Sequence, residues 1–107
     1  MINVTETITP LAANATFTGP ARKINRSPGT VIFDAYFYSD QVSATNGAKV
    51  EGSDDGVSWE LIKESSVVAL QPLLLEVPVI FNYIRVVLIN GAVNQTDLMV
   101  RSSINSI

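Results

Sequence analysis

The chain has 107 residues, 47 % of them hydrophobic, which is enough for one domain with its own core. Ten acidic residues stand against seven basic ones, and only 16 % of the chain is charged, so no nucleic-acid-binding surface is expected. Cysteine and histidine are absent, which excludes disulfides, thiolate nucleophiles and imidazole bases and leaves few ligands for a metal or haem. We therefore expect no metal, no cofactor and no catalytic residue.

The apolar residues recur with period two along the chain, which predicts an all-β protein. The first strand is expected over Ile2–Thr9, where Pro10 interrupts it, and a second, short strand over Ala15–Gly19. The segment Gly19–Gly29 contains two prolines and two glycines and predicts a long surface connection. Its basic cluster is interpreted as part of a solvated loop and comprises Arg22, Lys23 and Arg26.

The segment Thr30–Ser39, with the sequence TVIFDAYFYS, predicts the strongest strand. Its alternate residues form one apolar face, expected in the core, and one amphipathic, aromatic face. The apolar face comprises Val31, Phe33, Ala35 and Phe37, and the aromatic face comprises Ile32, Asp34, Tyr36 and Tyr38.

Two turn signals flank the next strand. Asp40–Gly47 is rich in turn residues and ends in Asn-Gly, which favours a tight reversal of the chain. Asp55-Gly56 predicts a tight hairpin turn between strands at Ala48–Gly52 and Ser58–Glu64. A calcium loop of the EF-hand type is not expected, because the two aspartates stand side by side and Ile62 occupies the position of the required glutamate.

Trp59, the only tryptophan, follows the Asp55-Gly56 turn. We expect it to face inward with Leu61 and to anchor the hairpin through its large buried surface. The alternative is an exposed tryptophan that serves as a platform for stacking a sugar.

The C-terminal part of the chain continues the series of strands. Val67–Val79 is apolar but contains two prolines, which predicts an irregular edge strand. Asn82–Asn90 is apolar on both faces apart from Arg85, so we expect it to be covered on both sides or to contact another subunit. The last strand is expected over Thr96–Ser103. The sequence thus predicts a single all-β domain over residues 1–107, with about eight strands.

Strands that are apolar on both faces need a partner, because a two-layer sandwich covers only one face of each sheet. We therefore expect a homo-oligomer, with a trimer preferred. A sugar site is the alternative for the exposed tyrosines, but protein interfaces also favour aromatic residues. Asp34 is expected to pair with Arg85 within the sheet or at an interface. The candidate interface residues are Tyr36, Tyr38, Leu73, Leu74, Leu75, Tyr83, Arg85, Val87 and Ile89.

The segments EGSDDGVSWELI and NYIRVVLING resemble the pattern of discoidin-like (F5/8 type C) jelly-roll sandwiches. Nearly the whole chain is similar to a small β-sandwich module of tailed-bacteriophage virion proteins. The matching segments are ITPLAANATFTGPAR, AYFYSDQ, VEGSDDGVSWE and VPVIFNYIRVVLINGAVNQTDLMVRSSI. The resemblance implies an antiparallel β-sandwich of jelly-roll type and a structural role in a virion.

We expect this structural protein to have no enzymatic activity. Because the chain starts at Met1 without an accompanying fibre or enzyme, we expect a capsid decoration (cement) protein that binds and stabilises the outer shell. Its partners would be further copies and the major capsid protein or another virion protein, but no nucleic acid and no membrane. The N-terminus MINVTETITP lacks the features of a signal peptide, so synthesis in the host cytoplasm and a place on the virion surface are expected. The alternative is a carbohydrate-binding or host-adsorption module of a tail or head fibre.

Overall fold

The computed structural model describes residues 2–24 and 30–106. This part of the chain consists of strands and connections, and no helix in it is long and apolar enough to cross a membrane. The strands are β1 (Ile2–Thr7), β2 (Thr16–Thr18), β3 (Arg22–Lys23), β4 (Val31–Ser39), β5 (Ser43–Ser53), β6 (Glu60–Ser65), β7 (Leu73–Pro78), β8 (Tyr83–Asn90) and β9 (Leu98–Ser106).

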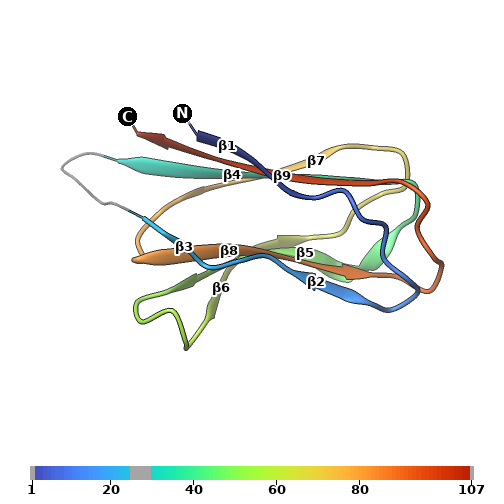
Figure 1. Cartoon of the computed structure of the whole chain (residues 1–107), viewed down its shortest axis with the longest axis horizontal. Coiled ribbons are helices and arrows are strands. Elements are labelled where there is room, and N and C mark those ends of the chain that lie inside the picture. Colours follow the sequence, from blue (N-terminus) through green and yellow to red (C-terminus); the bar gives the residue numbers. More distant parts are fainter. Residues whose placement is uncertain (1, 25–29, 107) are drawn as a thin grey trace.

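The strands form two antiparallel sheets that lie face to face (Figure 1). Sheet A has the order β1-β9-β4-β7, and sheet B has the order β2-β8-β5-β6, with β3 also paired with β8. Because β2 and β3 follow one another along β8, they fill a single strand position. The two orders are then those of a jelly roll. The predicted β-sandwich is confirmed, and the described residues form nine strands where about eight were expected.

The core lies between the sheets and follows the alternation read from the sequence. The inward residues of β4 are at most 5 % exposed, and the residues between them are half-buried on the outer face of sheet A. The inward side chains of β8 are at most 1 % exposed. The core residues on these two strands are Val31, Phe33, Ala35, Phe37, Ile84, Val86 and Leu88.

The strand β7 forms one edge of sheet A, as its prolines predicted. Pro72 directly precedes the strand and Pro78 is its last residue, so neither removes a hydrogen bond from the middle of the strand. In contrast, β8 lies inside sheet B, between β5 on one side and β2 and β3 on the other.

The chain reverses within the expected stretch Asp40–Gly47, at residues 40–42, but the tight turn expected at its Asn-Gly is wrong. The chain turns earlier, between β4 and β5, and β5 then runs through Asn46 and Gly47 without a break. The pairing of β5 with β8 shifts register between Ser43 and Ala48, and Asn46 has a φ of 52°. Asn-Gly lies in a β-bulge here and not in a turn. The sequence does not distinguish the two, because a bulge and a tight turn both need residues that tolerate unusual φ values.

The connection expected over Gly19–Gly29 contains β3, and Arg22 on that strand points between the sheets. Its Nη1 donates a hydrogen bond of 2.7 Å to Ser102 Oγ and lies 3.7 Å from Glu6 Oε2. The hydroxyl of Ser102 in turn donates to Glu6, whose side chain is 1 % exposed. The solvated-loop interpretation is therefore wrong for Arg22, which ties sheet B to sheet A. Arg26 lies outside the described residues.

Candidate functional site

The connection between β5 and β6 lies over the outer face of sheet B. Gly56 has a φ of +78°, and a Cβ at this position would lie 3.7 Å from the ring of Tyr83. The carboxylate of Asp55 orders the loop, because its Oδ1 accepts hydrogen bonds of 2.8 Å from the backbone N–H groups of Val57 and Ser58. These bonds, with Ser58 contributing most, hold the pKa of Asp55 below its usual range. The predicted tight hairpin turn is thus a wider, ordered loop.

Trp59 ends this loop and lies half-buried on the outer face of sheet B. Its ring stacks against Arg85, whose Cζ is 4.1 Å from the ring centroid. The expectation that Trp59 and Leu61 face inward is wrong, since Leu61 is 50 % exposed. A register shift between Val50 and Glu51 explains the difference: the bulge leaves the neighbouring Ile62 packed against the core.

Two basic side chains on the outer face of sheet B form ion pairs within the chain, whereas the exposed Lys23 of β3 forms none with a described residue. Arg85 Nε lies 2.7 Å from Glu51 Oε1, and Lys49 Nζ lies 2.7 Å from Glu64 Oε1. The expected pair of Asp34 and Arg85 is wrong, because Asp34 lies on sheet A and Arg85 on sheet B.

The outer side of β8 is therefore largely covered by its own chain. Val87 is only 7 % exposed, although its register partner Lys49 lies on the outer face. Val87 is thus not available as an interface residue. Tyr83, Arg85 and Ile89 are half-buried and stay candidate interface residues.

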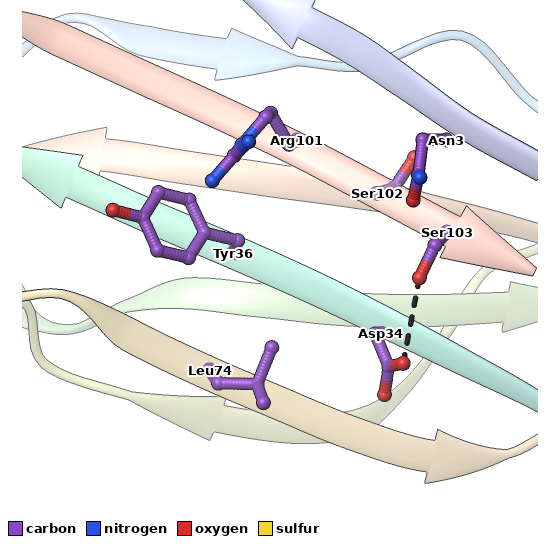
Figure 2. A pocket seen from close by; sticks show the side chains of 7 residues that line it. All are labelled: Asn3, Asp34, Tyr36, Leu74, Arg101, Ser102 and Ser103. Atoms are coloured by element: carbon purple, nitrogen blue, oxygen red, sulfur yellow. Dashed lines mark hydrogen bonds between the residues drawn. The ribbon is translucent and has the colours of Figure 1, made fainter.

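The outer face of sheet A, in contrast, has an open depression of about 280 Å³ (Figure 2). Side chains from all four strands of the sheet surround it. Polar and charged groups predominate, with one aromatic ring and one aliphatic side chain. The lining residues are Asn3, Asp34, Tyr36, Leu74, Arg101, Ser102 and Ser103.

Asp34 lies at one side of this depression and is incompletely hydrogen-bonded. Its Oδ2 accepts bonds of 3.1 Å from Asn105 Nδ2 and 3.4 Å from Ser103 Oγ, the second of which is drawn in Figure 2. Its Oδ1 is buried and has no hydrogen-bond partner in the described part of the chain. The register of β4 and β7 places Glu76 directly opposite Asp34.

Arg101 lies at another side of the depression, opposite Tyr36 in the register of β4 and β9. Its Cζ is 4.5 Å from the centroid of the Tyr36 ring. Arg101 is exposed and forms no ion pair with any residue that the structure describes. The stacked guanidinium is therefore held in place with its N–H groups open to a partner.

The three leucines of β7 alternate between the two sides of sheet A. Leu75 is 2 % exposed and belongs to the core, so its place among the candidate interface residues is wrong. Leu73 packs partly against the core. Leu74 is 58 % exposed and lies on the outer face with the half-buried Tyr36 and Tyr38.

A further surface, which the sequence analysis missed, lies at the end of the sandwich opposite the two termini (Figure 1). Four connections meet there: β1–β2, β4–β5, β6–β7 and β8–β9. We call this surface the apolar end, because it carries five aliphatic side chains that are 53–67 % exposed. Because the five residues are divided among four separate connections, they carry no periodic signal, and the sequence did not predict that they lie at one end. Its members are Ile8, Val42, Val68, Leu70 and Val93.

Hydrogen bonds between loops order the apolar end. Asp40 accepts a bond of 2.6 Å from Thr96 Oγ1 and bonds of 3.0 Å from the N–H groups of Thr96 and Asp97. These bonds, with the Thr96 hydroxyl contributing most, hold the pKa of Asp40 well below its usual range. Leu70 has a φ of 63°, and its N–H donates to the carbonyl of Ser39 at 2.9 Å. The loops are thus fixed to one another before any partner binds.

No group of three or more acidic side chains is placed to hold a metal ion within residues 2–24 and 30–106.

A family model described as "Uncharacterised protein YqxG N-terminal domain" matches residues 1–105. Among solved structures, the crystal structure of PBSX exported protein XepA is similar, with a TM-score of 0.87 and 17 % sequence identity. The match covers 99 % of this chain and 37 % of the XepA chain, so this chain spans little more than a third of that protein. At this identity the likeness concerns the fold. No curated protein matches the chain by sequence. The discoidin-like part of the resemblance is not confirmed by these matches.

Proposed function

This chain belongs to the YqxG N-terminal domain family, and its fold is similar to that of part of PBSX exported protein XepA; we propose that it is a structural module of a tailed-phage virion. XepA is described as a PBSX exported protein, and we take this likeness together with the resemblance of the sequence to virion modules as support for the proposed role. In this proposal the chain has no enzymatic activity. A chain without histidine and cysteine lacks the commonest acid, base and thiol nucleophile of enzymes.

Within a virion, the geometry best supports capsid decoration, in which the protein binds the outer shell and stabilises it. The apolar end is the observation that carries this proposal. Clustered, exposed aliphatic side chains on a soluble domain mark a surface for protein contact. Since the loops are already hydrogen-bonded to one another, docking would order few groups and lose little entropy.

The partners in this proposal are the major capsid protein or another virion protein, and further copies of this chain. The protein would be made in the host cytoplasm and would act on the virion surface. Its effect would come from apolar area buried where shell subunits meet, which adds contacts between them.

The experiment compares particles of the source phage that lack this protein with the same particles after addition of the purified chain. Cryo-electron microscopy is expected to show added density on the outside of the capsid, and the decorated particles should resist heat better. Density confined to the tail, or no density, would contradict capsid decoration.

Matched double variants identify the contact surface. Leu70→Ser with Val93→Ser removes two aliphatic side chains from the apolar end and should weaken particle binding at least about tenfold. Val57→Ser with Ile80→Ser removes two side chains that are 79 % and 65 % exposed from the loops at the other end. This control should bind as the wild type does. Equal losses in both variants would show that general hydrophobicity, and not the apolar end, drives binding.

A further inference from the structure

The outer face of sheet A carries three charged side chains that form no ion pair with any described residue. Two are acidic and directly opposite one another in the register of β4 and β7. Like charges in this position repel one another, so a cation that approached them would relieve the repulsion. The third is basic and lies on β9, on the other side of the depression shown in Figure 2. The three are Asp34, Glu76 and Arg101.

The two signs of charge are held apart on one face. Arg101 pairs in register with Tyr36, and Asp34 pairs with Ser103, so the base and the acid are separated by two positions along neighbouring strands. Arg101 stacks on the ring of Tyr36 and does not turn to Asp34. The face therefore has an acidic pole and a basic pole, with the Tyr36 ring and the exposed Leu74 beside them.

We infer that this face binds the same face of a second copy of the chain, with Arg101 of each copy entering the depression of the other and pairing with its Asp34 and Glu76. A two-fold axis between the two poles makes both contacts at once, since in such an interface residue i meets j and j meets i. The planar guanidinium, already stacked on Tyr36, can donate two parallel hydrogen bonds to a carboxylate.

A second copy fits this face better than other partners do, because the face is complementary to itself. A uniformly acidic partner would be repelled at Asp34 and Glu76, and a uniformly basic one at Arg101. The residue types on this face also suit a protein interface, because tyrosine and arginine, here Tyr36 and Arg101, are enriched in interfaces. The inference rests on the self-association in the proposed function and replaces the expected trimer with a two-fold pair. It does not depend on binding to a shell.

Charge reversal tests the inference without any phage particle, so its failure and the failure of capsid decoration are distinguishable. Sedimentation equilibrium should show that the wild type dimerises at micromolar to millimolar concentration. Arg101→Asp and Asp34→Arg should each weaken self-association at least about tenfold, because each leaves like charges facing one another. An equimolar mixture of the two variants should recover a dimer, since one face is then acidic and the other predominantly basic.

Glu51→Arg is the matched control, because it reverses a charge on the outer face of sheet B. Its dimer dissociation constant should stay within about threefold of the wild-type value. Circular dichroism checks that each variant is folded. The salt dependence of the wild type is a second test that needs no variant, because raised salt should weaken a dimer that charge pairs hold together. A wild type that is monomeric at millimolar concentration, or a mixture that stays monomeric, would overturn the inference. Binding of a glycan to a monomer, abolished by Asp34→Asn, would show that the depression is a ligand site and would also overturn it.

Discussion

The outer face of sheet B holds two ion pairs, whereas the three charged side chains on the outer face of sheet A form no ion pair with any described residue. On sheet B, the pairs Arg85–Glu51 and Lys49–Glu64 both have a nitrogen-to-oxygen distance of 2.7 Å. On sheet A, Asp34 faces another carboxylate across the strands, and Arg101 has only the ring of Tyr36 beneath it. The two faces of one sandwich therefore differ in what they leave for a partner.

The difference follows from what the chain places over each face. The loop between β5 and β6 lies on sheet B and brings Gly56 against Tyr83 and Trp59 against Arg85. Over Asp34 and Arg101, the depression of sheet A stays open. A strand that is apolar on both sides thus indicates a need for cover, but the cover can come from a neighbouring loop as well as from another subunit.

The largest expected effect is a difference in stability loss between substitutions on the inner and the outer side of sheet A. Phe37 is fully buried, so Phe37→Ala should lower the free energy of unfolding by about 3–5 kcal/mol. Tyr36→Ala, on the outer side of the same strand, should cost about 1 kcal/mol or less in the monomer but should weaken dimerisation. Urea unfolding at low concentration and sedimentation measure the two effects. A Tyr36→Ala cost near that of Phe37→Ala would mean that this outer face is part of the core.

A smaller effect is expected on sheet B. Trp59 is half-buried and stacked on Arg85, so Trp59→Ala should lower the free energy of unfolding by about 1–2 kcal/mol, less than the loss of a core aromatic residue. Its fluorescence should be partly open to quenchers, and Arg85→Ala should open it further. A fully shielded tryptophan with a loss of about 4 kcal/mol would place Trp59 in the core after all.

Acid tests a part of the molecule that lies on neither face. The hydrogen bonds from Thr96 and Asp97 lower the pKa of Asp40, so its stabilising contribution is present above the ordinary value near 4 and is lost as the pH falls further. Asp40→Asn should therefore lower the Tm at pH 7, and the difference from the wild type should shrink below about pH 4. Thermal unfolding followed by circular dichroism from pH 7 to acid measures this. A constant difference over the whole range would mean that the lowered pKa does not stabilise the loops.

The smallest effect concerns the paired charges of sheet B. The side chains of Lys49 and Glu64 are 22 % and 32 % exposed, and such pairs contribute little in water. Glu64→Gln should lower the free energy of unfolding by about 0.5 kcal/mol or less, and high salt should remove the difference. If the loss were well above about 1 kcal/mol, this pair would be important in holding the face together.

The sequence predicted the layers of the fold because alternation is a local signal. The alternation over Val31–Ser39 was enough to assign the inner and outer residues of β4, and prolines marked β7 as an edge strand. The bulges were not predictable in the same way. Asn46-Gly47 has the residues of a turn, and only its pairing with β8 shows that it lies within a strand.

The candidate site was less predictable, because it depends on which strands become neighbours. Asp34 and Arg85 looked like a pair from their positions in two apolar segments, but these segments belong to different sheets. No sequence pattern marks Arg101 as a site residue, because it lies beside Tyr36 only through the pairing of β4 with β9. The inward orientation expected for Trp59 was wrong because a bulge in the pairing of β5 with β6 changes which residues face the core.

Concentration-dependent NMR tests most directly the claim that sheet A, and not sheet B, has the open face. Spectra of the labelled wild type are recorded from micromolar to millimolar concentration. The methyl signals of Leu74 and the amide signals of Tyr36 and Arg101 should shift or broaden as the concentration rises, while the indole N–H of Trp59 stays unchanged. A Trp59 signal that moves while Leu74 and Arg101 remain constant would contradict the account.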